Sequence, residues 1–230
     1  MNGEVFVPAV RQEEIWREQR ESMVQTQLAA RGIRDLRVLD AMRRVPRHEF
    51  VDTHSRSQAY EDRPLPTLKG QTISQPYIVA FMLEALRLQE TDRVLEIGSG
   101  SGYTVALLSN LVAEVYGIER HTELEAAARA TLERLGYAGF KLKVGDGTLG
   151  WPTAAPFDAI LVSAATEQIP PALTAQLREG GRLVIPVGPA HVQELQLVTK
   201  YEEQPRIVTL AGCRFVPLVS DEHVAQPEIL

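Results

Sequence analysis

Glu96 and Glu119 each lie at or near the end of a short apolar run, and the first run opens into glycines at every second position. The apolar run, the glycines within Gly98–Gly102 and a helix start at Tyr103 predict a buried strand, a tight turn and a helix. A glycine turn lets a ligand approach the backbone, because no Cβ atom stands in the way. Glu119 follows the loop by about 20 residues, where an acid binds a ribose diol in nucleotide folds. The chemistry predicted is binding of a nucleoside-containing cofactor.

The loop departs from the pattern of a dinucleotide site. In G-x-G-x-x-G, the pyrophosphate lies at the helix N-terminus. Gly98 and Gly100 match, but Tyr103 stands where the third glycine belongs. Glu96 would repel two phosphates and attract a cationic ligand. S-adenosylmethionine carries a sulfonium and an ammonium group, so Glu96 favours this cofactor; an ordinary strand-to-helix connection is the alternative for an isolated glycine turn.

A third acid, Asp146, follows the next predicted strand and is flanked by Gly145 and Gly147. It can accept a hydrogen bond from an adenine amino group, although an Asp-Gly turn alone explains the residues equally well. Ligands of open α/β sheets bind at the carboxyl ends of the strands. Acids or glycine turns at three successive strand ends therefore favour a nucleoside site.

From Arg93 onward, strand and helix patterns alternate. Strands are expected at about 93–97, 114–118, 140–144, 158–162 and 182–187, with helices at about 103–112, 122–135 and 171–178. The runs 194–200 and 206–216 predict an antiparallel hairpin at the sheet edge. The predicted fold class is α/β: a doubly wound, mostly parallel sheet with helices on both faces, Rossmann-like, with a C-terminal antiparallel edge hairpin.

The N-terminal part is predicted to be helical. Residues 10–31 have apolar residues at near-helical spacing and are closed by Gly32. A second helix is expected from the N-cap Asp35 to Arg44, before Pro46.

Residues 43–48 contain Arg43, Arg44, Arg47 and His48. We interpret this cluster as solvated surface with acid partners nearby in the sequence, and a small anion patch is the alternative.

Ser74 lies at the end of a segment rich in proline and glycine, so residues 60–73 are predicted to form a loop. Ser74 is predicted to be the N-cap of a helix with Pro76 in its first turn. A hydroxyl at a helix start is also well placed for an anion.

Composition excludes several classes of function. The chain has 230 residues, a net charge of −6 and no dense run of Lys or Arg, so nucleic acid is not expected as a partner. Cys213 is the only cysteine and the five histidines show no ligand spacing, so neither a disulfide nor a metal site is expected. No signal-like or membrane-spanning stretch is recognised, so we expect a cytoplasmic protein with no membrane partner.

Six segments together resemble the protein-L-isoaspartate O-methyltransferase family. Two of them, Thr72–Pro76 and Arg214–Leu218, are specific to that family, whereas the glycine loop indicates only a methyltransferase of the common fold. The segments are Thr72–Pro76, Val94–Tyr103, Gly145–Gly147, Pro156–Ile160, Gly180–Leu183 with Pro186–Gly188, and Arg214–Leu218. The resemblance runs from about Arg20 to Val219, in the family's order and spacing.

The resemblance implies methyl transfer from S-adenosylmethionine to the α-carboxylate of L-isoaspartyl residues in damaged proteins. It implies that Ser74 is the catalytic-site residue and that the cofactor is held by Gln71, Thr72, Ile73, Glu96, Gly98, Ser99, Gly100, Glu119, Asp146 and Gly147. It also implies one methyltransferase domain over residues 20–230, made of a helical part at 20–92, the cofactor-binding sheet at 93–219 and a tail at 220–230. Residues 1–19 form an extension outside the resemblance, and they could pack as an extra helix, pair subunits or shield the cleft.

Two other functions stay open from the sequence. One is a related carboxyl methyltransferase dedicated to another peptide. The other is a non-catalytic protein that keeps the nucleoside pocket. Amide or adenine methylation is disfavoured, because Ser163–Thr166 follows the predicted strand 158–162. Enzymes that methylate those groups usually carry an Asn/Asp-Pro-Pro-aromatic motif at this place.

Overall fold

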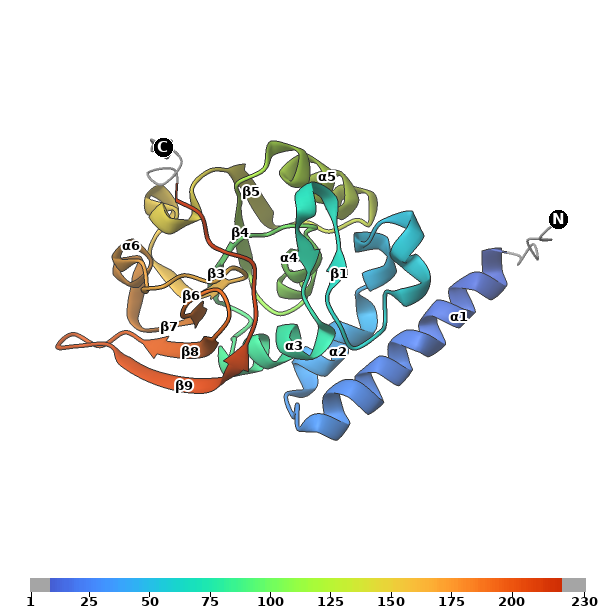
Figure 1. The fold of residues 1–230 in the computed structure, drawn as a ribbon, viewed down its shortest axis with the longest axis horizontal. Coiled ribbons are helices and arrows are strands. Elements are labelled where there is room, and N and C mark those ends of the chain that lie inside the picture. The colour runs from blue at the N-terminus through green and yellow to red at the C-terminus, as the bar shows by residue number, and fades with distance from the viewer. Residues whose placement is uncertain (1–8, 221–230) are drawn as a thin grey trace.

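The computed structural model describes residues 9–220 and contains a seven-stranded sheet in the order β5-β4-β3-β6-β7-β8-β9 (Figure 1). The strands are β3 (Arg93–Ile97), β4 (Glu114–Glu119), β5 (Phe140–Val144), β6 (Phe157–Val162), β7 (Leu177–Val187), β8 (Gln193–Thr199) and β9 (Arg206–Cys213). The first five pair in parallel, and β7–β8 and β8–β9 pair antiparallel. The predicted fold class is confirmed. The first eight residues of the predicted extension, and the predicted tail beyond Ser220, lie outside the described residues.

The direction in which the chain adds strands to the sheet reverses between β3 and β6. From β3 the chain adds β4 and then β5 on one side, and it returns to add β6 and β7 on the other. The loops after β3 and β6 therefore leave the sheet in opposite directions, and a crevice forms between them. An ideal Cβ on Gly98 would lie 3.8 Å from Ser163, so the two loops are in contact.

Helices cover both faces of the sheet. They are α1 (Ala9–Ser22), α2 (Leu36–Arg44), α3 (Pro76–Ala85), α4 (Tyr103–Leu108), α5 (Thr122–Arg134) and α6 (Pro171–Ala175). Two apolar clusters result, because strand side chains alternate between faces. In β3, Val94 packs with α3, α4 and α5, whereas Leu95 and Ile97 pack toward α6. Within the described residues, no helix is long and apolar enough to cross a membrane.

α4 ends earlier than predicted. The side chains of Ser109 and Asn110 donate to the carbonyls of Val105 and Ala106, at 2.9 and 2.8 Å. Such side-chain bonds compete with the helix backbone, so the chain turns after Leu108 instead of continuing to residue 112.

α6 also ends earlier than predicted, and β7 begins at Leu177 instead of residue 182. Gln176 causes both differences. Its carbonyl accepts from the amide of Phe157 at 2.9 Å, and its side-chain amide bonds to Trp151 and Leu149. Leu177 then pairs with Phe157 in β6.

The N-terminal helices follow the prediction in outline. α1 continues through a π-helical turn (Met23–Leu28) and a 3-10 turn (Ala29–Arg31) and ends at Gly32, whose φ is 105°. Asp35 caps α2 by accepting from the amides of Arg37 and Val38. Part of the predicted extension thus forms an added helix, which runs along the side of the molecule in Figure 1.

The prediction that the cluster at 43–48 is solvated surface is confirmed for Arg43 and Arg44 and wrong for Arg47 and His48. Arg43 and Arg44 form surface ion pairs, but Arg47 and His48 are buried, with exposed fractions of 0% and 1%. His48 lies between Trp16 of helix α1 and Tyr60, which begins the loop at 60–73. Its ring stacks on Trp16 at 3.9 Å between centroids, and its Nδ1 lies 2.7 Å from the hydroxyl of Tyr60.

Residues 60–73 carry more structure than predicted. β1 (Leu65–Pro66) and β2 (Thr72–Ile73) pair antiparallel around a 3-10 turn (Leu68–Gly70). Ser74 is not the helix cap, and that prediction is wrong. Gln75 occupies the N-cap position with an extended ψ of 137°, because the residue before Pro76 is pushed out of the helical region.

We expect His48 to make the stability of the protein fall in mild acid. Burial lowers the pKa of His48 to about 4, partly offset by Glu49 and reinforced by Arg20 and Arg56. The unfolded chain takes up a proton near pH 6.5, whereas the native state does so only near its lower pKa. Stability is therefore lost as pH falls between these values, by about 1 to 2 kcal/mol at pH 5 relative to pH 7. Urea denaturation at both pH values should show a smaller difference for His48→Gln than for the unaltered protein, and equal differences would contradict this origin.

Candidate active site

The glycine loop after β3 is fastened to the end of β4. The amides of Gly98 and Ser99 both donate to the carbonyl of Ile118, at 2.8 and 3.1 Å. Gly98 and Gly100 have φ values of 77° and 51°, which favour glycine, and they turn the chain back toward β4. Backbone atoms of the loop therefore stand at the crevice between β3 and β6.

Glu96 is buried at the end of β3 with one carboxylate oxygen unpaired. Only 1% of the residue is exposed. Oε1 accepts from the hydroxyl of Ser163 at 3.1 Å, and Oε2 is buried with no hydrogen-bond partner. Burial raises the pKa of Glu96 to about 8; the hydrogen bond from Ser163 and the nearby hydroxyl of Thr104 lower it in part, and the charge of Glu119 raises it further. A buried, half-satisfied acid of this kind is suited to a cationic ligand.

Glu119, at the end of β4, joins the loop to the next helix. Its Oε2 accepts from the amide of Gly100 at 2.9 Å, and its Oε1 accepts from the amide of His121 at 3.0 Å. Each oxygen keeps a lone pair for a further donor. Glu119 thus holds the glycine loop, a structural role beside the ribose binding that the sequence predicts.

Asp146 and Gly147 lie at the end of the next strand and border the same region. The Oδ1 of Asp146 accepts from the amide and hydroxyl of Thr148 at 2.8 and 2.7 Å, and Oδ2 lies 3.2 Å from the hydroxyl of Ser220. A Cβ on Gly147 would lie 2.4 Å from Ile97 in β3. Only glycine lets this strand end approach β3 so closely.

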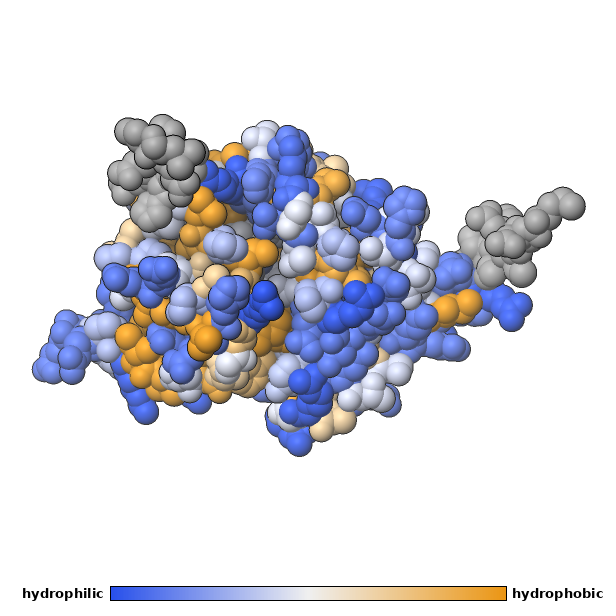
Figure 2. Space-filling model, in the orientation of Figure 1, coloured by the Kyte–Doolittle hydropathy of each residue, from blue (hydrophilic) through white to orange (hydrophobic). Residues whose placement is uncertain are grey.

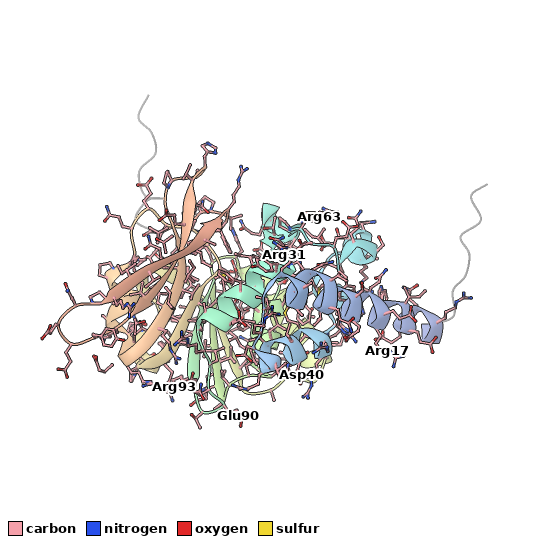
Figure 3. All side chains as sticks on the ribbon, turned by 90° about the horizontal axis from the view of Figure 1, so that it is seen from below. Arg17, Arg31, Asp40, Arg63, Glu90 and Arg93 are labelled. Atoms are coloured by element: carbon pink, nitrogen blue, oxygen red, sulfur yellow. The ribbon has the colours of Figure 1, made fainter. Side chains whose placement is uncertain are left out.

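A cavity of about 1030 Å³ opens at the carboxyl end of β6, and its lining includes Ser163 but not Glu96, the glycine loop or Glu119. Thr72, Ser74 and Tyr77 form one wall, and Ser163 contributes from the end of β6. Arg31 stands at this cavity, with its guanidinium 3.7 Å from the ring centroid of Tyr77. In Figure 3, Arg31 lies well apart from Arg93, which begins β3. Ser163 directly follows β6, so the cavity lies toward the carboxyl end of that strand.

The opposite wall is formed by residues 211–218, which return from β9 across the end of the sheet. Ala165 pairs with this segment: its amide donates to Val216 at 2.8 Å, and its carbonyl accepts from Leu218 at 2.6 Å. Gln193 holds Phe215 by both backbone groups, at 2.7 and 3.3 Å. β9 therefore ends at Cys213 and not at residue 216 as predicted. In Figure 2, apolar residues gather over the β7–β9 part of the molecule, whereas the α1 side is mostly hydrophilic.

The structure places the predicted site residues in two groups, which Ser163 connects. Glu96, Ser99, Gly100 and Glu119 meet around the glycine loop. Thr72 and Ser74 line the cavity beside Ser163, which hydrogen-bonds Glu96.

Gln71 and Ile73 stand behind this wall. Ile73 is buried, and Gln71 takes part in the turn before it, where its backbone bonds to Thr67 and Leu68.

Sequence reasoning missed Ser163 and Gln193. Ser163 follows directly on the predicted strand 158–162, so its place at the switch point was a usable signal. Gln193 directly precedes the predicted run 194–200, and no local pattern marks it. Within residues 9–220, no group of three His, Cys, Asp or Glu side chains could hold a metal ion.

The residues present fit S-adenosylmethionine. Glu96 offers an unpaired carboxylate oxygen to a cation, Ser99 has a buried hydroxyl with no partner, and the glycine loop leaves backbone within reach. The strand order, the fastened glycine loop and the buried acid define a Rossmann-like methyltransferase.

Comparisons with known proteins narrow this class. The sequence profile of the Protein-L-isoaspartate(D-aspartate) O-methyltransferase family matches residues 18–223. A Protein-L-isoaspartate O-methyltransferase from Opitutus terrae is 56% identical over 205 residues, which cover 89% of this chain and 88% of that protein. One from Syntrophobacter fumaroxidans is 55% identical over 87% of this chain and 94% of its own. The chain belongs to the protein-L-isoaspartate O-methyltransferase family, as its sequence resemblance implies.

Solved structures agree with this assignment. A Plasmodium falciparum protein, described as a beta-aspartate methyltransferase and determined in complex with S-adenosyl-L-homocysteine, matches with a TM-score of 0.76. It is 27% identical, and the match covers 87% of this chain and 98% of that one.

We expect cofactor binding to be coupled to the proton on Glu96. In the free protein Glu96 is protonated below its raised pKa, whereas a cation favours the carboxylate, so binding at pH 7 releases a proton. Affinity for S-adenosylmethionine should therefore fall as pH is lowered from 9 to 6, by up to about tenfold per unit. Calorimetry in two buffers of different ionisation enthalpy measures both effects.

Glu96→Gln should lose the pH dependence and weaken binding at pH 9 by about 1.5 to 3 kcal/mol. An affinity of the unaltered protein that is independent of pH would contradict this coupling.

Proposed function

We propose that this chain transfers a methyl group from S-adenosylmethionine to the α-carboxylate of L-isoaspartyl residues in damaged proteins. Membership of the family over residues 18–223 is the observation that carries this proposal. The cavity beside Ser74 and the unpaired oxygen of Glu96 support it, because they offer a place for an acceptor next to a place for a cationic donor.

Each predicted residue has a role in the proposed cofactor site. Glu96, Gly98, Ser99 and Gly100 hold the methionine part, Glu119 the ribose hydroxyls, Asp146 and Gly147 the adenine, and Gln71, Thr72 and Ile73 the wall toward the substrate. S-adenosylmethionine, when bound, supplies an electrophilic methyl group. The contacts of Glu119 support its role, since both oxygens already face the glycine loop and the start of α5.

The acceptor needs alignment more than activation. A carboxylate with a pKa of about 4 is ionised at neutral pH, so no general base is required to make it a nucleophile. Correct alignment of two reacting groups can contribute several kcal/mol to catalysis. In the proposed mechanism, the walls of the cavity exclude water and the hydroxyl of Ser74 orients the acceptor carboxylate.

Ser74 is proposed as a hydrogen-bonding residue and not as a covalent nucleophile. A serine nucleophile needs an adjacent base, in most enzymes a histidine positioned by an acid. Among residues 9–220, no histidine or acid hydrogen-bonds the hydroxyl of Ser74. The methyl ester formed on the isoaspartyl residue then closes to a succinimide outside the protein, with the neighbouring backbone nitrogen displacing methanol. Hydrolysis of the succinimide restores some normal aspartate.

We also propose that the protein acts in the cytoplasm and not on nucleic acid. The single cysteine is consistent with a reducing compartment, and the net charge of −6 disfavours binding to a phosphate backbone.

The proposed activity predicts methylation of an isoaspartyl peptide but not of its aspartyl twin. With radiolabelled S-adenosylmethionine, base-labile label should appear on the isoaspartyl peptide alone. Label on both peptides would indicate a different carboxyl methyltransferase. Label on neither, with cofactor binding intact, would indicate a protein that uses its nucleoside site only for binding.

Ser74→Ala should reduce turnover far more than cofactor affinity. Losing an orienting hydroxyl should lower kcat by about tenfold to a hundredfold, because small misplacements of reacting groups are costly. Steady-state kinetics and calorimetry with S-adenosyl-L-homocysteine separate the two quantities. Ser109→Ala is the matched control, since its hydroxyl bonds only to Val105 in α4. Equal losses of turnover and affinity in Ser74→Ala would reject the orienting role.

A further inference from the structure

Arg47 is a fully buried cation without an acidic partner. Its exposed fraction is 0%, and it forms no ion pair with any acid in the described part of the chain. Burial lowers the pKa of its guanidinium, and Nη1 has no hydrogen-bond partner. Burying a charge in this way is costly, and an apolar side chain of similar size often stabilises a fold as well or better. Packing alone therefore gives a poor account of an arginine at this position.

The guanidinium joins three segments that are far apart in the sequence. Nε donates to the carbonyl of Ala59 at 2.7 Å, and Nη2 donates to the carbonyl of Ser74 at 2.8 Å. The ring of Tyr103 lies beneath it, with its centroid 4.9 Å from Cζ. Tyr103 is the first residue of α4 and follows directly on the glycine loop.

We propose that Arg47 is a positioning residue for Ser74. It ties the backbone of Ser74 to the start of α4 and so fixes the hydroxyl relative to the glycine loop that holds the methyl donor. This inference rests on the proposed function of Ser74.

The segment that carries Arg47 is itself fixed to the N-terminal helices. His48, the next residue, stacks on Trp16 of α1 and bonds to the hydroxyl of Tyr60, while Gln27 donates to the carbonyl of Tyr60 at 2.9 Å. Arg20 of α1 donates to the same hydroxyl at 3.2 Å. The guanidinium thus transmits a position fixed by the N-terminal helix to Ser74 in the cavity wall.

The test compares Arg47→Met and Arg47→Lys in methylation of an isoaspartyl peptide. Methionine avoids an unpaired buried charge and removes both donors, whereas lysine can reach only one of the two carbonyls. We expect kcat to fall by about tenfold to a hundredfold for methionine and less for lysine. The KM for S-adenosylmethionine should change by less than about twofold, because a positioning defect acts on the acceptor and not on uniform binding of the donor.

A second comparison asks whether Arg47 acts through Ser74. In a Ser74→Ala background, Arg47→Met should have little further effect on kcat, since two changes on one path are not additive. A purely structural role would lower kcat by the same factor in both backgrounds. Arg37→Lys is the matched control: Arg37 also donates to two backbone carbonyls, those of Leu88 and Leu111, away from the cavity. It should leave kcat unchanged.

An unchanged kcat in Arg47→Met, equal factors in the two backgrounds, or failure of both variants to fold would overturn the inference. Failure of the unaltered protein to methylate the peptide would instead reject the proposed function, so the two can be told apart.

Discussion

The unpaired carboxylate oxygen of Glu96 is the constraint on which the site depends. A buried acid beside a second acid is unfavourable without a cation, and its raised pKa reports that cost. The surrounding structure nevertheless holds Glu96 in this buried position. β3 buries its backbone in the centre of the sheet, Ser163 satisfies one oxygen, and the loop that follows is fastened to β4. The free protein is thus prepared for a positive ligand before one arrives.

The carboxylates at the strand ends also have a structural role. Glu119 accepts from the amides of Gly100 and His121, so the acid assigned to the ribose also shapes the loop assigned to the methionine part. Asp146 likewise organises its own turn through Thr148. The positions of these binding groups are therefore coupled, and removing one carboxylate alters the position of its neighbours as well as the charge.

Local sequence patterns predicted the fold and the acids at the strand ends, because both depend on local signals, whereas the site roles of Ser74 and residues 71–73 came from the family resemblance. Strand periodicity, glycine turns and acids at strand ends placed Glu96, Glu119 and Asp146 at one edge, as a parallel sheet requires. The errors of burial occurred where a distant partner decided the outcome. Arg47 and His48 look like surface residues in a charged stretch, but Trp16, Tyr60 and Tyr103 bury them.

One error of boundary has a local cause and another a distant one. Ser74 matches the pattern of a helix cap, but Pro76 forces Gln75 into that position. The bonds of Gln176 to Trp151 and Leu149, which end α6, join segments that no local pattern relates.

The two hydrogen bonds between Gln193 and Phe215 join the start of β8 to the segment that follows β9. They fix the first residue of β8 to Phe215, so a change of length before Gln193 leaves residues 211–218 of the cavity wall in place. Ala190 and His191 line the cavity just before this anchor, so exchanging them alters the surface that meets a polypeptide while residues 211–218 stay in register. Recognition of large polypeptides and alignment of the small acceptor group are, in this architecture, free to diversify separately.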